Sequence, residues 1–237
     1  MLHAAMPVIT ITGLYGAGRE TIGAMVAEQL DAELLDRKIF TEVSRRLDLP
    51  DEEVEAQEET PASLLDRVLV ALGASSADFS QPPEAAWAPP YEDVPYDTRK
   101  AVLRITQEVI REAARTGNAV IVGRGGMMVL AERMLTLHVF LHGPEEDRLA
   151  SVQRTSNLSE AAARKLLRHT DENRGSYIKQ VYGTDWRKPA HYQLVLDTCW
   201  LGWERAAKII VSAARAHVGP PEAPAPAPAS DSSPQLH

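Results

Sequence analysis

The chain has 237 residues, of which 44% are hydrophobic and 24% are charged, and its formal net charge is -8 at pH 7. This length and balance suit one globular α/β domain with a sizeable core. The negative charge argues against broad binding to nucleic acid, which needs many cationic contacts with phosphates. The single cysteine excludes a disulfide framework within the chain.

The same features indicate where the protein resides. The sequence does not open with a basic region and a long apolar run, and no stretch reaches the roughly 18 apolar residues of a membrane span. A lone cysteine suits a reducing compartment. We therefore expect a cytoplasmic protein without membrane or nucleic-acid partners, which could form a homo-oligomer.

The first predicted elements are a strand, a glycine-rich turn and a helix. Residues 7–12 are β-branched and apolar, which is typical of a buried parallel strand. Residues 21–30 carry apolar side chains at helical spacing. This order opens a βαβ unit, and a short strand over 33–36 and a helix over 37–47 continue it.

The middle of the chain changes character. Helices are expected to begin at Pro50 and at Pro61, and repeated prolines over 74–96 then break any regular element. That stretch predicts a flexible insertion, either a lid-like loop or a surface loop with no role. Residues 98–115 form the clearest amphipathic helix of the sequence.

Strands and helices alternate again in the second half. Strands are predicted over 119–122, 136–142 and 193–197, and helices from Pro144, over 159–182 and over 201–216. Five apolar strands between helices predict a three-layer α/β/α domain with a parallel sheet covered on both faces. This single domain spans 1–218, and the tail over 219–237, rich in proline and alanine, is expected to be disordered.

The turn after the first strand has the glycine spacing of a P-loop. Four residues separate Gly13 from Gly18, and Gly16 lies between them. Glycines suit this position because successive backbone N–H groups must turn inward around an anion, where a Cβ would obstruct them. The following helix adds the positive end of its dipole. The predicted phosphate-binding residues are Gly13, Gly16, Ala17, Gly18, Arg19, Glu20 and Thr21.

The end of this loop departs from the usual P-loop pattern. Arg19 occupies the place of the usual lysine, Glu20 follows it, and Thr21 comes next. An arginine is longer and planar, so it does not replace lysine neutrally. Glu20 could repel phosphate, or could hold Mg²⁺ together with Thr21, directly or through water. Three possibilities stay open: a loop that supports phosphoryl transfer, one that binds a nucleotide without efficient transfer, and a turn with no ligand.

Further candidates are cations, because phosphoryl transfer depends on positioning and on positive charge. Arg124 follows a buried strand at its carboxyl end, where ligands bind in open α/β sheets. Asp171 and Arg174 lie one helical turn apart, as a ligand-binding pair or as a surface ion pair. Arg148 is a further candidate cation. Three more arginines lie where a lid is expected and are either lid cations or solvated surface residues: Arg154, Arg164 and Arg168.

Several segments taken in order resemble the cytidylate kinase-like family. They are residues 9–23, 27–30, 35–37, 122–126, 171–174, 182–186 and 192–198. The resemblance spans residues 7–216 and depends on the order and spacing of these segments. It implies a parallel sheet with a helical monophosphate-binding insertion and a lid. It also implies that ATP, with Mg²⁺, donates a phosphoryl group to CMP or dCMP or to a related small phosphate acceptor.

The resemblance also implies roles for individual residues. Donor phosphates would be cradled by Gly16, Gly18, Arg19 and Thr21. The monophosphate-binding segment would begin at Asp36 and Arg37, and Arg154 and Arg168 would belong to the lid. Acceptor contacts would come from Arg124, Asp171 and Arg174, and the catalytic cations would be Arg19, Arg124 and Arg174.

Three positions depart from the family pattern. Gly125 stands where an acidic residue is usual, and Leu167 and Glu42 stand where arginines are usual. Two hypotheses follow from the whole sequence. The first is an ATP-dependent kinase of a nucleoside monophosphate. The alternative is a regulatory P-loop protein that binds a nucleotide with weak or no turnover.

Overall fold

Five parallel strands form one sheet in the computed structural model, which describes residues 7–48, 96–133, 135–156 and 158–216. The strands are β1 (Val8–Gly13), β2 (Glu33–Leu35), β3 (Ala119–Val122), β4 (Thr136–His142) and β5 (Leu194–Asp197). Their order is β2-β3-β1-β4-β5, and every pairing is parallel. The predicted five-stranded parallel sheet is confirmed.

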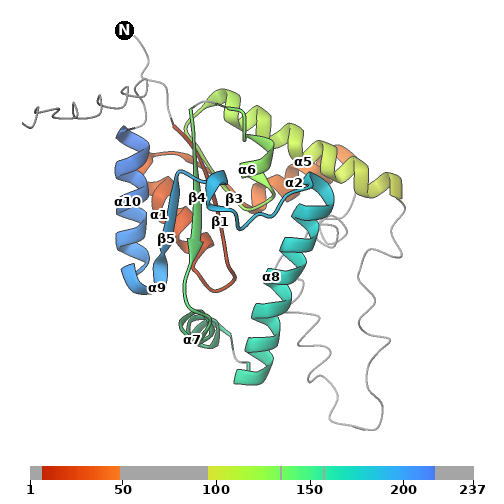
Figure 1. Ribbon diagram of the computed structural model, residues 1–237. Helices are drawn as coiled ribbons and strands as arrows, with labels where there is room; N and C mark the ends of the chain where they lie inside the picture. The colour runs from red at the N-terminus through yellow and green to blue at the C-terminus, as the bar shows by residue number, and fades with distance from the viewer. Residues whose placement is uncertain (1–6, 49–95, 134, 157, 217–237) are drawn as a thin grey trace, which may run out of the picture.

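Helices cover both faces of the sheet, so the three predicted layers are confirmed as well (Figure 1). One face packs against α1 (Arg19–Leu30) and α10 (Trp203–Ala216). The other faces α2 (Arg37–Leu47), α5 (Tyr96–Thr116), α6 (Gly126–Val129) and α8 (Glu160–Tyr182). The remaining described helices are α7 (Glu145–Thr155), α9 (Thr198–Leu201) and a 3-10 turn at Pro189–His191. None of the helices described here is long and apolar enough to cross a membrane.

The central strand β1 shows why the apolar runs of this sequence become strands. Alternate side chains of a strand point to opposite faces, and both faces are covered here. Ile9 and Ile11 pack into the core beneath α1 and α10, whereas Val8 packs into the core beneath α2 and α5. All three are fully buried.

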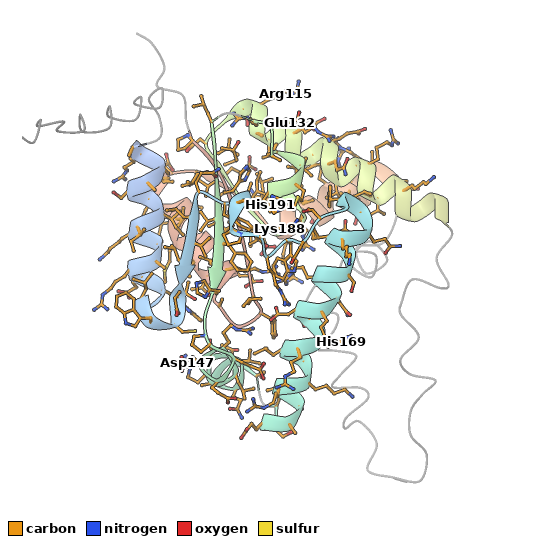
Figure 2. The ribbon with its side chains drawn as sticks, in the orientation of Figure 1. Arg115, Glu132, Asp147, His169, Lys188 and His191 are labelled. Atoms are coloured by element: carbon orange, nitrogen blue, oxygen red, sulfur yellow. The ribbon has the colours of Figure 1, made fainter. Side chains whose placement is uncertain are left out.

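Parallel pairing brings the carboxyl ends of the strands to one edge. β1 pairs with β3 from Val8 opposite Ala119 and with β4 from Val8 opposite Thr136. Asp147 on α7 lies at this end of the molecule, and Arg115 and Glu132 lie at the other (Figure 2). The loops after β1, β3, β4 and β5 therefore meet at a single edge, the usual place for a ligand in an open α/β sheet.

Some predicted boundaries shift. Helix α1 begins at Arg19 rather than at residue 21, after Gly18 in a left-handed conformation. One helix was predicted over 201–216, but Gly202, also left-handed with φ 79°, separates α9 from α10. The short helix α6 was not predicted. The helices expected from Pro50 and Pro61, the tail over 219–237 and all but Tyr96 of the insertion over 74–96 lie outside the described residues, and Tyr96 itself begins α5.

A buried histidine links the two middle strands and makes stability depend on pH. The Thr10 hydroxyl and His138 Nδ1 are 2.7 Å apart, and burial lowers the pKa of His138 from 6.5, outweighing a backbone hydrogen bond with Leu130 that favours the charged form. The unfolded chain then binds a proton that the folded chain resists, so the free energy of unfolding should fall as pH drops below about 6.5. We expect His138→Gln to flatten this slope.

Urea unfolding at a series of pH values between about 5 and 7 would measure the effect. Leu137→Val, at the neighbouring buried position of the same strand, is the matched control, because it changes packing without removing a titrating group and should keep the wild-type slope. Burial also lowers the pKa of His169, so a smaller slope should remain in His138→Gln. A slope equal to that of the wild type would show that His138 is not the group responsible.

Candidate active site

A tight turn over residues 13–18, here called the glycine turn, joins β1 to α1. Gly16 and Gly18 both have φ of 81°, a left-handed conformation that residues with a Cβ rarely adopt. The backbone N–H of Ala17 donates to the carbonyl of Leu14 at 3.1 Å, which closes the turn. Gly18 then caps α1 at its amino end. A turn of this kind at a helix N-terminus has the backbone geometry that cradles phosphate.

Side chains from the carboxyl end of β5 support one side of the glycine turn. The Thr198 hydroxyl donates to the carbonyl of Ala17 at 2.8 Å and lies 3.2 Å from the carbonyl of His142. The Trp203 indole packs against Gly18 so closely that a Cβ on Gly18 would lie 2.5 Å from the ring. Sequence reasoning missed the contact of Thr198 with the turn, and a hydroxyl residue just after the last strand was the available signal.

The other side of the glycine turn is held by α7 and α8. A carboxylate oxygen of Asp171 accepts the backbone N–H of Tyr15 at 2.8 Å. Arg174 donates to the carbonyl of Gly13. The predicted pair on α8 therefore divides its contacts between two residues of the turn.

Arg19 and Glu20 form a short ion pair at the end of the turn. Arg19 Nε donates to Glu20 Oε1 at 2.6 Å, and the Arg19 side chain is only 11% exposed. Its guanidinium reaches across to the end of β3, where a Cβ on Gly123 would lie 3.3 Å from Nη1. Burial works to raise the pKa of Glu20, but the charge and the hydrogen bond of Arg19 outweigh it and lower the pKa. Glu20 is therefore a carboxylate at neutral pH.

The loop after β3 places a second arginine opposite the glycine turn. Gly123, Arg124 and Gly125 are left-handed in succession, with φ of 72°, 54° and 65°. For an arginine this conformation costs about 1–3 kcal/mol, and such strain persists mostly at functional sites. The Arg124 side chain is 7% exposed, and its Nη2 lies 3.8 Å from Asp36 Oδ1. Burial raises the pKa of Asp36 more than the charge of Arg124 lowers it.

A cavity of about 50 Å³ lies between these two loops. This cavity, here called the arginine cavity, brings together Arg19, Arg124 and Arg174, the three residues predicted to be catalytic. The other side of the cavity is mainly apolar and aromatic, with Met127, Tyr177, Ile178, Trp186 and Tyr192. The Arg174 guanidinium carbon lies 5.3 Å from the centre of the Trp186 ring, close enough for a cation–π interaction. Three guanidinium groups around one small cavity make a site for an anion.

Other predicted residues lie elsewhere. Arg37 and Arg154 are exposed and do not line this cavity. Arg164 and Arg168 bind acidic residues of α7, with Arg168 Nη2 at 2.7 Å from Glu145. Asp171 lines a second, wider cavity of about 680 Å³ beside α7 and β4. Arg164 and Arg168 thus tie α7 and α8 together in this conformation.

The predicted metal ligands form at most a partial site. No group of three or more His, Cys, Asp and Glu side chains that could hold a metal occurs within the described part of the chain. Thr21 is exposed, and Glu20 already accepts a hydrogen bond from Arg19. Since Mg²⁺ takes many of its ligands from phosphates and water, a carboxylate and a hydroxyl beside the glycine turn still fit it.

Comparison with known proteins places this geometry in context. The model of the cytidylate kinase-like family matches residues 8–199. A cytidylate kinase of Methanopyrus kandleri is 26% identical over 200 residues, which cover 81% of this chain and 84% of that protein. Among solved structures, an uncharacterized protein from Eubacterium ventriosum shares the fold with a TM-score of 0.61 and 15% identity, covering 89% of this chain and 99% of that one.

Two glycines allow the packing of the turn to be tested. Gly18 and Gly183 both have a left-handed φ, so replacing either with alanine costs about 1–2 kcal/mol of strain. A Cβ on Gly18 would also collide with Trp203, whereas no atom lies within 4 Å of a Cβ on Gly183. Urea unfolding should therefore show a loss for Gly18→Ala that exceeds that of Gly183→Ala by roughly 1–3 kcal/mol. Equal losses would contradict the packing of Trp203 on the turn.

Proposed function

Because the chain belongs to the cytidylate kinase-like family, we propose that it transfers a phosphoryl group from ATP to a small acceptor that carries a phosphate. The first acceptors to consider are CMP and dCMP, since the relative from Methanopyrus kandleri is a cytidylate kinase. One observation supports the proposal above all others: Arg19, Arg124 and Arg174 line a single cavity beside the glycine turn.

The arrangement suits the two halves of such a reaction. The glycine turn and the N-terminus of α1 would bind the donor phosphates through backbone N–H groups. Arg124 and Arg174 would bind the acceptor phosphate from the opposite loop and from α8. Arg19 begins at the turn and ends at the loop after β3, so its guanidinium lies where the two substrates would meet. Positive charge at that point stabilises the group in transfer.

Magnesium would be held at the start of α1. Thr21 and Glu20 are the residues that would position it, together with phosphate oxygens. When bound, the ion neutralises negative charge on the phosphates. The chain's own contribution there is orientation: the Arg19–Glu20 bond fixes the carboxylate, and the lowered pKa keeps it ionised.

The walls of the cavity bear on the identity of the acceptor. Tyr177, Trp186 and Tyr192 offer flat surfaces suited to a base or another planar group. The acidic residue usual at position 125 would not fit easily, because a Cβ there would lie 3.0 Å from the Tyr182 hydroxyl. Glu42 binds Arg45 and Arg46 on its own helix. The glycine at position 125 therefore favours an acceptor that is bound by its planar face more than by acidic contacts, and Glu42 leaves the acceptor phosphate to the arginines of the cavity.

A second candidate function is nucleotide binding without efficient turnover, in a regulatory role. The Arg19–Glu20 ion pair favours it, because it occupies Arg19 Nε and places a negative charge at the phosphate site. Radiolabelled ATP, incubated with a panel of nucleoside monophosphates, separates the two. Labelled diphosphate product supports the kinase. ATP binding without product supports the regulatory protein, and no ATP binding contradicts both.

Removal of the Arg124 side chain should weaken binding of the acceptor more than binding of ATP. We expect Arg124→Ala to raise the KM for the acceptor by roughly 10–100-fold, the range for losing a charge-assisted hydrogen bond, with a smaller change in the KM for ATP. The control is Arg104→Ala, which removes an exposed arginine that pairs with Glu108 on α5. Steady-state kinetics with the acceptor found in the panel would measure both. An unchanged acceptor KM in Arg124→Ala would remove Arg124 from the site.

A further inference from the structure

Resting on the proposed function, we infer that Asp171 is a positioning residue of the glycine turn and does not contact the acceptor. The resemblance to known kinases implies an acceptor contact at this position. In this chain, however, the carboxylate does not line the arginine cavity. It lines the cavity beside α7, whereas its neighbour Arg174 lines the arginine cavity.

Both carboxylate oxygens of Asp171 already have partners. Oδ1 accepts the backbone N–H of Tyr15 at 2.8 Å, and Oδ2 accepts Nη1 of Arg148 at 2.9 Å. The side chain of Asp171 is 6% exposed and that of Arg148 is 7% exposed. A buried carboxylate engaged in this way has little capacity left for the hydroxyl or amino group of an acceptor.

Arg148 completes the support from α7. Its Nη1 also donates to the carbonyl of Tyr15 at 2.8 Å, and its Nε donates to the carbonyl of Gly143 at 3.0 Å. Asp171 and Arg148 together therefore bind both polar groups of the Tyr15 backbone. The next residue, Gly16, has no room for a Cβ, which would lie 2.7 Å from the carbonyl oxygen of Arg148. The peptide groups around Tyr15 are thus fixed between the turn's own strand and two distant helices.

The main effect of the buried Asp171–Arg148 ion pair is to fix the backbone conformation at Tyr15. Such a pair adds little net stability compared with apolar residues of similar size, but removal of one partner leaves an uncompensated charge. Its hydrogen bonds to the Tyr15 backbone define a specific conformation that apolar packing would not define. The backbone of Tyr15 leads directly into Gly16 and Gly18, the left-handed residues that shape the turn. Asp171 therefore acts on the donor phosphates through the main chain.

The same helix connects the two substrate sites. Arg174, three residues after Asp171, donates to the carbonyl of Gly13 and lines the arginine cavity. Helix α8 thus holds the turn at Gly13 and at Tyr15 while it forms one wall of the acceptor site.

The experiment compares Asp171→Ala and Asp171→Asn with Glu172→Gln. Glu172 is the next residue on α8 and is exposed, and its replacement with glutamine removes one negative charge, as the Asp171 variants do. Hydrogen exchange of the Tyr15 amide, measured by NMR without nucleotide, reports the bond to Asp171 directly. Equilibrium binding of ATP and the separate KM values for donor and acceptor report its effect on function.

We expect Asp171→Ala to speed exchange of the Tyr15 amide and to weaken ATP binding, each by about tenfold or more, as for the loss of a charge-assisted hydrogen bond. Asp171→Asn, which retains an acceptor oxygen, should show a smaller change, and Glu172→Gln none. The KM for the acceptor should change less than twofold in all three. A general loss of folded structure would not weaken ATP binding while leaving the KM for the acceptor unchanged.

The opposite pattern would overturn the inference. If Tyr15 exchange and ATP affinity stay at wild-type values in Asp171→Ala while the acceptor KM rises, Asp171 is an acceptor ligand. Should Asp171→Ala fail to fold, Arg148→Lys keeps the charge but loses the fork that binds Asp171 and Tyr15 together, and the same readouts apply. The exchange measurement needs no turnover, so its result does not depend on the kinase proposal. Unchanged exchange of the Tyr15 amide overturns the inference even if the protein is a kinase. Faster exchange supports the inference even if no acceptor is found.

Discussion

The geometry of the candidate site depends on hydrogen bonds that distant side chains make to the backbone of one turn. An anion site built from main-chain N–H groups leaves the carbonyls of the same turn in need of donors. Arg174 supplies one for Gly13, Arg148 one for Tyr15 and Thr198 one for Ala17. These donors come from α8, α7 and α9, so the shape of the turn depends on β4 pairing with β1 and β5 pairing with β4.

The parts of the structure that local patterns decide could be predicted from the sequence. The five strands are short apolar runs, and burial on both faces requires such runs. The spacing of Gly13, Gly16 and Gly18 predicted the turn, because a backbone that turns around an anion has no room for Cβ atoms at these positions. Arg124 was found because it follows a buried strand at its carboxyl end, and the structure places it in the arginine cavity. Each of these inferences needed only neighbours in sequence.

The parts that depend on long-range pairing could not be predicted. Asp171 lies 156 residues from Tyr15, and no spacing indicates that its carboxylate binds a backbone N–H of the turn. Its spacing from Arg174 suggested one shared face, but the two side chains line different cavities. The sequence left Arg164 and Arg168 open as lid cations or surface residues and gave no sign of their pairing with Glu145 and its neighbours on α7, because unlike charges 19 or 23 residues apart pair only once α7 and α8 are packed.

Arg19, in the place of the usual lysine, also makes a contact that depends on residues distant in sequence. A lysine offers one compact charge, whereas arginine offers a planar fork that can bind two partners at once. Arg19 uses Nε for Glu20 and extends its other nitrogens toward Gly123, at the end of the neighbouring strand. A lysine ammonium is a single compact group and lacks this planar spread of donors. The arginine and the glutamate therefore form one unit, in which Glu20 fixes the direction of the guanidinium that spans the two loops.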